Sequence, residues 1–373
     1  MFSKGLNPMN EKESQILHLI KDNPFITQNE IAGKLNLSRS AIAGYISSLT
    51  KQGKLLGRAY VLPEGKRIVC IGGANMDRKS SLEKAFRLET SNPVQTTSTL
   101  GGVARNIAEN LGRIGADVHL LTVVGDDREG KDVLARTGEY VKILPSLEIA
   151  GHTTGTYTAI LDEHGNMAVA FADMGIYDAV DIPFIEKRWS HIAASSMVLL
   201  DTNFPKEIIS YIIGRCADEG IPVSVVPVSI PKLDRLPENL SGLEWLILNR
   251  EEAEVLSGLT VNDDESVRAA GAKILARGVR HVIITRSEKG LYFINDKGEE
   301  GFLTGQPADS VVDVTGAGDS LAAGIMLGAI EGHSILESCQ YGMSSASITI
   351  QSKETVSPSL NRLSLEKEKE RLF

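Results

Sequence analysis

Short apolar segments rich in β-branched residues recur between residues 68 and 285, and longer segments with helical patterns lie between them. Apolar strands that alternate with helices are typical of a mostly parallel sheet covered by helices on both faces. We therefore expect a doubly wound α/β fold. The expected strands are residues 68–73, 117–124, 192–200, 222–228, 245–248 and 281–285.

Residues 153–173 depart from this pattern. Apolar residues alternate with small or polar ones over residues 157–161 and again over 167–171, with a turn at 163–166 between them. This alternation is typical of a hairpin rather than of a strand–helix–strand unit. Inside an α/β domain such an insertion often covers the site, so we expect a small β lid with strands within about 78–100 and 153–173.

The first part of the chain predicts a separate module of three short helices and a two-stranded wing at residues 55–62. The helix-start signals are Asn10 with Glu13, Thr27 with Glu30, and Ser38. This arrangement resembles the winged helix-turn-helix of bacterial regulators. We expect one domain at residues 1–66 and a second at residues 67–373.

A helix-turn-helix of this kind would place its third helix in the major groove of DNA. Arg39 and Ser40 would lie near base edges, and Lys51 and Arg58 would contact phosphates. Residues 1–66 hold nine Lys or Arg against five Asp or Glu, a net charge of +4, whereas the remainder holds 30 against 43, or −13. The front module is therefore the part suited to a polyanion. The alternative is a module that mediates dimerisation or packs on the larger domain.

The three cysteines (Cys70, Cys216 and Cys339) are far apart and odd in number, which argues against a disulfide framework or a zinc site. No apolar run approaches the roughly 20 residues that span a bilayer, and no signal-peptide pattern opens the sequence. We expect a cytoplasmic protein that does not enter a membrane.

A glycine-rich stretch, Gly316-Ala317-Gly318-Asp319, precedes an apolar run of helical length at residues 321–327. Backbone N–H groups at such a helix start attract anions. A carboxylate there makes chemical sense if Asp319 takes the proton of a substrate hydroxyl while the N–H groups hold a transferring phosphoryl group. The alternative is an ordinary glycine-rich turn with an aspartate that caps the helix.

Other polar clusters follow expected strands, where open α/β sheets bind ligands. They are Asn75 with Asp77, Gly101 and Gly102 with Asn106, Asn249 with Glu252, and Thr285 to Gly290. Asn249 and Glu252 are three apart at a helix start and are suited to water-mediated contact with Mg²⁺ or phosphate. Each cluster also has a simpler interpretation: a surface turn for Asp77, a surface amide for Asn106, and an N-capped helix for Asn249.

Together these clusters resemble the ribokinase-like, phosphofructokinase-B type family of sugar and nucleoside kinases over residues from about 67 to 361. The matching motifs are Gly72-x-x-Asn75-x-Asp77, Gly101-Gly102-x-x-x-Asn106, Val124-Gly125-x-Asp127-x-x-Gly130, Asn249-x-x-Glu252, Thr285-x-x-x-x-Gly290 and Asp313-x-Thr315-Gly316-Ala317-Gly318-Asp319. Six motifs in the family's order are far more specific than any one alone. The segment Gly101–Asn110 and the fused front module resemble the pseudouridine-kinase branch. Val226-Pro227 departs from the Asp-Pro of many relatives.

The resemblance implies a ribokinase-like fold whose β lid pairs with the lid of a second subunit, giving a homodimer. It implies substrate-binding roles for Asn75, Asp77, Gly101, Gly102 and Asn106, and nucleotide-binding roles for Asn249, Glu252, Thr285, Ser287 and Gly290. Asn249 and Glu252 would organise Mg²⁺-ATP through water. Gly316, Ala317 and Gly318 would form the anion hole, and Asp319 would be the base. Asp313 and the Thr315 carbonyl would bind a monovalent cation, K⁺.

Our leading hypothesis is ATP-dependent phosphorylation of the 5′-hydroxyl of pseudouridine. The closest alternatives are a ribokinase, a fructokinase or another nucleoside kinase. An alternative of a different class is a transcriptional regulator that uses the kinase fold to sense a sugar or nucleoside. Candidates for contact with the base are Thr156, Tyr157 and Met174.

Overall fold

The computed structural model describes residues 11–23, 26–56, 65–144, 146–308 and 310–373. Its main sheet has the strand order β15-β14-β13-β12-β11-β10-β1-β4-β6. The seven strands from β13 to β6 are parallel, and β14 and β15 are antiparallel to their neighbours. The strands are β1 (Arg67–Ile71), β4 (Asp117–Leu121), β6 (Lys142–Ile143), β10 (Met197–Asp201), β11 (Val223–Val226), β12 (Leu243–Asn249), β13 (His281–Thr285), β14 (Leu291–Asn295) and β15 (Glu300–Leu303). The doubly wound, mostly parallel fold expected from the sequence is confirmed.

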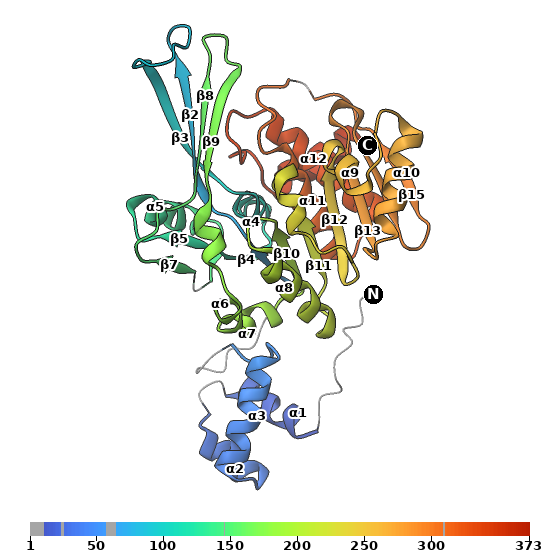
Figure 1. Cartoon of the computed structure of the whole chain (residues 1–373). Coiled ribbons are helices and arrows are strands. Elements are labelled where there is room, and N and C mark those ends of the chain that lie inside the picture. The colour runs from blue at the N-terminus through green and yellow to red at the C-terminus, as the bar shows by residue number, and fades with distance from the viewer. Residues whose placement is uncertain (1–10, 24–25, 57–64, 145, 309) are drawn as a thin grey trace.

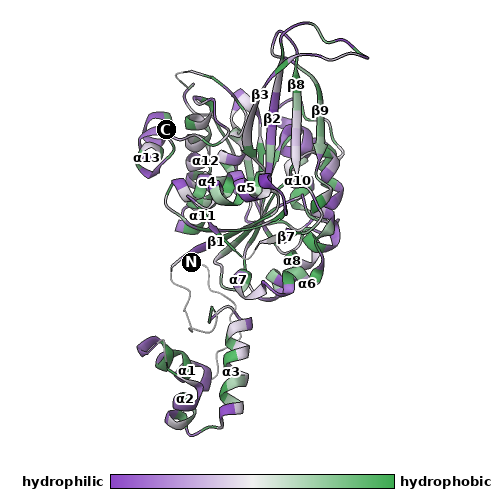
Figure 2. Cartoon of the chain, turned by 90° about the vertical axis from the view of Figure 1, so that its left-hand side faces the viewer, coloured by the Kyte–Doolittle hydropathy of each residue, from purple (hydrophilic) through white to green (hydrophobic). Residues whose placement is uncertain are grey.

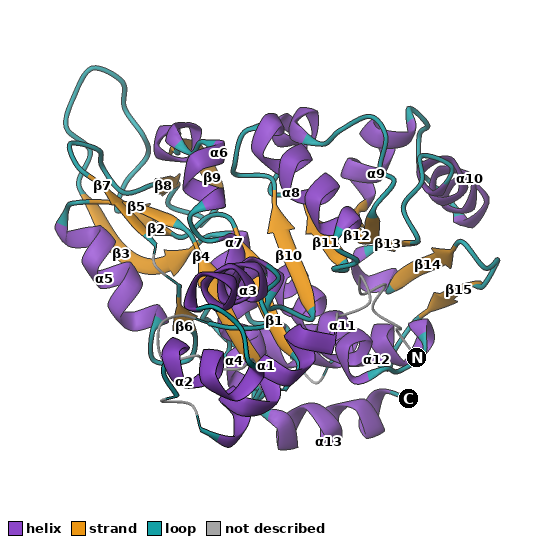
Figure 3. Cartoon of the chain, turned by 90° about the horizontal axis from the view of Figure 1, so that it is seen from below, coloured by secondary structure: helices purple, strands orange, loops and turns teal. Residues whose placement is uncertain are grey.

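Helices cover both faces of the main sheet because each buried strand presents apolar side chains to both sides. Val69 and Ile71 of β1 pack in one apolar cluster, whereas Ile68 and Cys70 pack in another on the opposite face. The first face carries α6 (Ile182–Glu186), α7 (Trp189–Ala193), α8 (Lys206–Asp218), α9 (Arg250–Ser257) and α10 (Asp264–Leu275). The second carries α4 (Val103–Arg113), α5 (Arg128–Thr137), α11 (Ala317–Glu331), α12 (Ile335–Ile350) and α13 (Arg362–Leu372). Figure 3 shows the sheet between α8 to α10 on one side and α11 to α13 on the other.

Most expected strands begin or end one or more residues from where the sequence indicated, and two of them also contain a different element. Residues 189–193 form α7, so the strand expected at 192–200 begins at Met197. The segment expected as one strand at 117–124 divides, because β5 (Val123–Gly125) pairs with β7 (Leu147–Ile149) in a separate two-stranded sheet. Both errors concern apolar runs, whose burial alone does not separate a strand from a helix or one strand from two.

A second sheet, which we call the lid sheet, has the order β3-β2-β8-β9. Its strands are β2 (Asn75–Leu82), β3 (Val94–Gly101), β8 (Thr156–Leu161) and β9 (Met167–Asp173). β8 and β9 form the antiparallel hairpin expected from the alternating pattern. The lid sheet projects beyond the helices of the main sheet (Figure 1). Hydrophilic residues lie along β2, whereas β9 is mainly hydrophobic (Figure 2).

The front module contains α1 (Glu11–Asp22), α2 (Gln28–Leu35) and α3 (Arg39–Lys51), which enclose an apolar cluster of their own. Thr27 and Glu30 form the expected capping box, and the Ser38 hydroxyl accepts the Ala41 N–H at 3.1 Å. These helices fit a winged helix-turn-helix. Asn10 and nearly all of the expected wing, with Arg58, lie outside the described residues.

The module and the main domain meet where α3 ends. Gly53 has a φ of +68°, and a Cβ added to it would lie 2.3 Å from the backbone nitrogen of Ala194, just after α7. Side chains larger than hydrogen are therefore excluded from this contact. Lys66 follows, and its ammonium donates to the Ile330 carbonyl at 2.7 Å. Arg67 begins β1 and forms an ion pair with Asp117 of β4.

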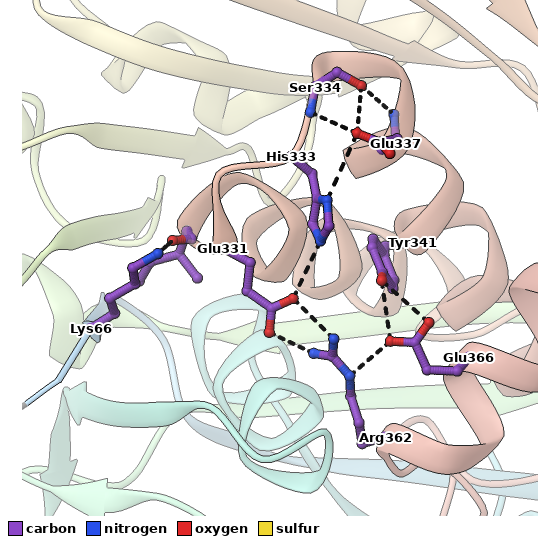
Figure 4. A network of polar contacts seen from close by, with 9 residues as sticks. Lys66, Glu331, His333, Ser334, Glu337, Tyr341, Arg362 and Glu366 are labelled. Carbon is purple, nitrogen blue, oxygen red and sulfur yellow. Dashed lines mark hydrogen bonds and ion pairs between the residues drawn. The ribbon is translucent and has the colours of Figure 1, made fainter. Parts of the chain in front are cut away.

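The end of α11 that receives Lys66 also holds the last helix of the chain. Arg362 forms a two-pronged ion pair with Glu331, at 2.6 and 3.0 Å. Tyr341 donates to Glu366, which pairs with Arg362 (Figure 4). This network joins α11, α12 and α13. Three short 3₁₀ helices complete the described elements: η1 (Gly175–Ala179), η2 (Ile230–Arg235) and η3 (Ser287–Lys289). In the part of the chain that the structure describes, no helix is both long and apolar enough to cross a membrane.

Candidate active site

The glycine-rich stretch forms a tight turn at the start of α11. Gly316 precedes the helix with a φ of +83°, and a Cβ there would lie 2.0 Å from the Thr355 carbonyl oxygen. The turn thus requires glycine and packs on the loop after α12. A Cβ at Gly318 would meet no atom within 4 Å, so this side of the turn is open. Amides in the first helical turn have no carbonyl partner within the helix, and they are suited to an anion.

Asp319 lies in the first turn of α11, where Asn106 of α4 donates its amide Nδ2–H to the Asp319 Oδ2 at 2.7 Å. The helix has no side-chain cap, so the interpretation of Asp319 as a capping residue does not hold. Burial raises the pKa of Asp319 to about 7, against the Asn106 hydrogen bond and the charge of Arg105. The negative charges of Asp201 and Asp77 act in the same direction as burial. A carboxylate poised near neutral pH is suited to accept a proton.

Arg105 holds Asn106 in position. Its guanidinium is 2% exposed and donates from Nε to the Asn106 Oδ1 at 3.1 Å. It also donates to Glu109, one turn further along α4, at 2.5 Å. Because Arg105 occupies the Asn106 oxygen, the amide nitrogen is the group that faces Asp319.

Asp77 lies at the start of the lid sheet, where Asn75 donates to its Oδ1 at 2.6 Å. A Cβ on Gly101 of the neighbouring strand would lie 2.3 Å from the Asp77 carboxylate oxygens, so glycine is required for this carboxylate to fit. Burial raises the pKa of Asp77 to about 6, while Arg105, Asn75 and Lys79 favour its ionised form. Arg105 thus acts on both Asp77 and Asp319 through its charge.

A buried carboxylate that the sequence analysis missed, Asp201, fixes the backbone beneath these groups. Asp201 is 1% exposed at the end of β10, and its Oδ2 accepts the N–H groups of Gly73 at 2.8 Å and Ala104 at 3.0 Å. Its Oδ1 accepts the Asn203 N–H at 2.8 Å. Asp201 therefore ties the glycine turn after β1 to the start of α4, which carries Arg105 and Asn106.

These contacts bring Asn75, Asp77, Gly101, Gly102 and Asn106 together with Asp319. The fold agrees with the comparisons. Residues 66–362 match the pfkB family of carbohydrate kinases, and residues 9–55 match the winged helix-turn-helix DNA-binding family.

The chain belongs to the pfkB family of carbohydrate kinases.

Two relatives from Escherichia coli (strain K12) share nearly a third of their residues with this kinase. The uncharacterized sugar kinase YeiI is 32% identical, over 96% of this chain and 99% of its own length. The pseudouridine kinase is 31% identical, over 79% of this chain and 93% of its own. This pfkB kinase is accordingly a phosphotransferase with an alcohol acceptor, a sugar or nucleoside.

Two solved structures show the same fold. A carbohydrate kinase from Agrobacterium tumefaciens is 28% identical, with a TM-score of 0.73 over 83% of this chain and 98% of its own. The Arabidopsis thaliana ribokinase, complexed with ribose and ATP, is 22% identical, with a TM-score of 0.68 over 82% of this chain and 98% of its own.

The residues expected to bind the nucleotide lie at the ends of β12 and β13, where Asn249 and Thr285 are register partners. Asn249 and Glu252 form a capping box: the Asn249 Oδ1 accepts the Glu252 N–H, and the Glu252 Oε2 accepts the Asn249 N–H, both at 2.9 Å. The N-capped helix, given as the simpler interpretation, is therefore present. The second carboxylate oxygen and the amide nitrogen are not used by the box.

The turn after β13 has backbone angles that few side chains permit. Ser287 has a φ of +51° and Gly290 a φ of +78°. A Cβ at Gly290 would lie 2.0 Å from the Leu303 carbonyl oxygen. This turn, like the one at Gly316, brings bare backbone to the surface of the kinase near the ends of the strands, which is the arrangement that phosphates prefer.

The Asp313 carboxylate, which was expected to bind a monovalent cation, is already engaged by side chains and backbone. The Asp313 Oδ1 accepts the N–H and the hydroxyl of Thr315, at 2.8 and 2.7 Å, and its Oδ2 accepts the Lys79 ammonium at 3.2 Å. Partial burial opposes the ionisation of Asp313, but these hydrogen bonds hold its pKa below the ordinary value. The Asp313 carboxylate therefore does not fit a free potassium ion in this arrangement. Within the described ranges, no group of three or more His, Cys, Asp or Glu side chains forms a metal site.

Of the candidates for contact with the base, Thr156 and Tyr157 are the register partners of Met76 and Asp77 in the lid sheet. Tyr157 donates its hydroxyl to the Met167 sulfur at 3.7 Å, and a Cβ at Gly155 would lie 3.1 Å from the Met174 sulfur. Arg39, Ser40 and Lys51 are exposed on α3, in the front module.

Three residues that the sequence analysis missed contact the candidate site residues or the backbone beside them: Arg105, Asp201 and Lys79. Arg105 stands next to Asn106 in the quoted motif, and Asp201 directly follows an expected strand, so both positions carried a signal. Lys79 is two residues beyond Asp77. Residues with this spacing lie on the same face only in a strand, and the sequence analysis did not predict one strand that contains both residues.

Proposed function

We propose that this kinase transfers the γ-phosphoryl group of ATP to the 5′-hydroxyl of pseudouridine. The observation that carries the proposal is the Asn106–Asp319 contact at the first turn of α11, beside a glycine turn open to an anion. Asp319 accepts the hydroxyl proton as the bond from the 5′-oxygen to the γ-phosphorus forms. The bond from the γ-phosphorus to the β–γ bridging oxygen breaks, and ADP leaves. The amides at Gly316 to Gly318 hold the charge of the phosphoryl group in transit.

Asp77 and Asn75 hold the ribose in this proposal. A carboxylate accepts hydrogen bonds from two neighbouring hydroxyl groups and so fixes the sugar ring. Pseudouridine is supported by the 31% identity to a pseudouridine kinase over 93% of that protein. The lid sheet, which carries Asp77, excludes water that would otherwise accept the phosphoryl group.

Asn249, Glu252, Thr285, Ser287 and Gly290 bind the nucleotide in this proposal. Mg²⁺ retains several waters and is held mainly by phosphates, which fits the unused oxygen of Glu252 and the lack of a three-ligand cluster in the described residues. When bound, Mg²⁺ neutralises charge on the triphosphate. We propose no step through potassium, because Lys79 already engages Asp313.

A panel of acceptors tests the substrate. Ribose, fructose, adenosine, inosine, uridine and pseudouridine would each be incubated with Mg²⁺-ATP, and ADP and the phosphorylated product would be measured together. We expect pseudouridine to give the highest kcat/KM. A preference for ribose or fructose would replace the nucleoside assignment by a sugar kinase. Absence of product from all six, with the acceptors still bound, would favour the regulator that only senses its ligand.

We also propose that the front module binds DNA through α3. The match of residues 9–55 to a winged helix-turn-helix family and the exposure of Arg39, Ser40 and Lys51 support this proposal. Neutralised phosphates release counterions, so affinity for duplex DNA should fall as salt concentration rises. Arg39→Ala should weaken binding, whereas Gln28→Ala on α2 is the control. Affinity without salt dependence would contradict DNA binding.

A homodimer through the lid sheets is the third part of the proposal. Met167 and Phe171 of β9 are each 62% exposed, on a strand with a free edge in the described sheet. Exposed apolar side chains on an edge strand favour pairing with another chain. The molar mass measured by light scattering should be that of a dimer for the wild type and that of a monomer for Phe171→Glu. A monomeric wild type would reject the proposal.

A further inference from the structure

A lysine of the lid sheet reaches the loop that leads into the glycine turn. Lys79 lies on β2 two residues after Asp77, so both side chains are on the same face of the strand. Its ammonium Nζ lies 3.2 Å from the Asp313 Oδ2, and Asp313 comes three residues before Gly316. The contact joins segments that are 234 residues apart in the chain.

The same carboxylate shapes the loop. Through its other oxygen, Asp313 accepts the backbone N–H and the hydroxyl of Thr315, the residue before Gly316. The Val312 N–H donates to the Ile350 carbonyl at 2.8 Å, which fixes the start of the loop against the end of α12. A cation beside Asp313 therefore balances the charge of a carboxylate whose position determines where the glycine turn begins.

Lys79 is the cation that the structure provides there. Among the residues that the structure describes, it is the ion-pair partner of Asp313. A primary ammonium carries the single positive charge of a monovalent metal ion, and it donates up to three hydrogen bonds as a compact point charge. Unlike a free ion, it has no binding equilibrium with the solvent.

We propose that the Lys79 ammonium takes the place of a dissociable monovalent cation at Asp313, so that phosphoryl transfer by this kinase does not require potassium. The inference rests on the proposed kinase function for its activity measurement, but not for its stability measurement. Since Lys79 and Asp77 share β2, the strand that binds the acceptor also delivers the charge to the loop that binds the phosphoryl group. The lid sheet thereby couples the two halves of the site.

The test uses the full-length kinase with Lys79→Met and, as a matched control, Arg78→Met. Arg78 is the adjacent residue of β2 and forms an ion pair with Glu129 of α5, away from Asp313. Phosphorylation of the preferred acceptor would be measured in potassium chloride and in tetramethylammonium chloride at equal ionic strength. For the wild type and for Arg78→Met, we expect the phosphorylation rates in the two salts to differ by less than about twofold. In tetramethylammonium chloride, the phosphorylation rate of Lys79→Met should be at least about tenfold lower than that of the wild type. Added potassium should restore most of this rate, with a saturable dependence on its concentration.

Thermal unfolding in the same salts gives a second readout that needs no acceptor. Potassium should raise the Tm of Lys79→Met and leave that of the wild type unchanged, because a ligand stabilises the state that binds it. A wild type that requires potassium would overturn the proposal. So would a folded Lys79→Met that is equally active in both salts, or one whose lost activity potassium does not restore. If no acceptor is phosphorylated, the kinase function fails, and the Tm comparison still decides the role of Lys79.

Discussion

Two carboxylates near α4, Asp319 and Asp77, differ in how far burial raises their pKa values, to about 7 and about 6. The identity of Asp319 as the expected base was readable from the motif, since a carboxylate in an anion site needs a reason to be there. The pKa of Asp319 could not be read from the motif, because it depends on how closely α4 approaches α11 and on the charge of Arg105. Side-chain partners that are 213 residues apart leave no local signal in a sequence.

We expect the acid limb of the pH profile to report Asp319. A base must be ionised, so kcat/KM should fall about tenfold per pH unit below about 7, and more steeply below about 6, where Asp77 also takes up a proton. Asn106→Ala removes a hydrogen bond that favours the ionised form of Asp319, so the limb should move to higher pH. Asn166→Ala, in the turn of the lid hairpin, is the control. A profile that stays flat down to pH 5 would contradict this account.

The strands and helices of the kinase domain place glycine wherever backbone and side chain approach too closely for a Cβ. The sequence motifs identified Gly101, Gly290 and Gly316 as important. The structure shows which atoms a Cβ added at each of these positions would clash with. Element boundaries were less predictable. The strand expected at 192–200 ends at Asp201, so the residue that organises the strand ends was excluded by one position.

Gly101→Ala should impair acceptor binding. The new Cβ would lie 2.3 Å from the Asp77 carboxylate and displace it from the position that Asn75 stabilises. We expect KM for the acceptor to rise at least about tenfold, with a smaller change in KM for ATP. Gly175→Ala, where a Cβ meets no atom within 4 Å, is the matched control. Equal kinetics for both variants would show that Asp77 does not hold the acceptor.

Asp201→Ala should destabilise the kinase domain. The substitution would leave the buried N–H groups of Gly73, Ala104 and Asn203 without their acceptor. We expect a loss of about 3 kcal/mol in the free energy of unfolding, measured by urea denaturation. Asp178→Ala removes an exposed ion pair with Arg235 and should cost less than about 1 kcal/mol. A loss for Asp201→Ala as small as that of the control would contradict the bridging role.

At the scale of the whole molecule, the chain is a pfkB kinase domain with a helix-turn-helix module attached at its front. The opposite net charges of the two parts and the change in pattern near residue 66 predicted two units. How they meet was not predictable, because the contact depends on the backbone of Gly53 against Ala194, with no side chain from Gly53 to mark it. The expected DNA-contacting residues Arg39, Ser40 and Lys51 remain exposed on α3.

Gly53→Val should loosen the contact between module and kinase domain, because a Cβ has no space there and the φ of +68° is strained for valine. We expect faster amide hydrogen exchange in residues 189–194 and unchanged exchange in β10. Gly44→Val, at a position of α3 where a Cβ meets no atom, is the control. Unchanged exchange at 189–194 in Gly53→Val would show that the two parts do not pack through α7.

The most direct test of the proposed chemistry compares wild type with Asp319→Asn in the presence of Mg²⁺-ATP and pseudouridine, with products followed by phosphorus NMR and acceptor binding by calorimetry. We predict that the wild type forms one pseudouridine 5′-phosphate for each ADP. Asp319→Asn should bind pseudouridine with similar affinity but turn over at least about 10²-fold more slowly, since its amide cannot accept the proton. A variant with near-normal turnover, or a wild type that releases phosphate to water without forming the ester, would contradict the assignment of Asp319 as the base of a nucleoside kinase.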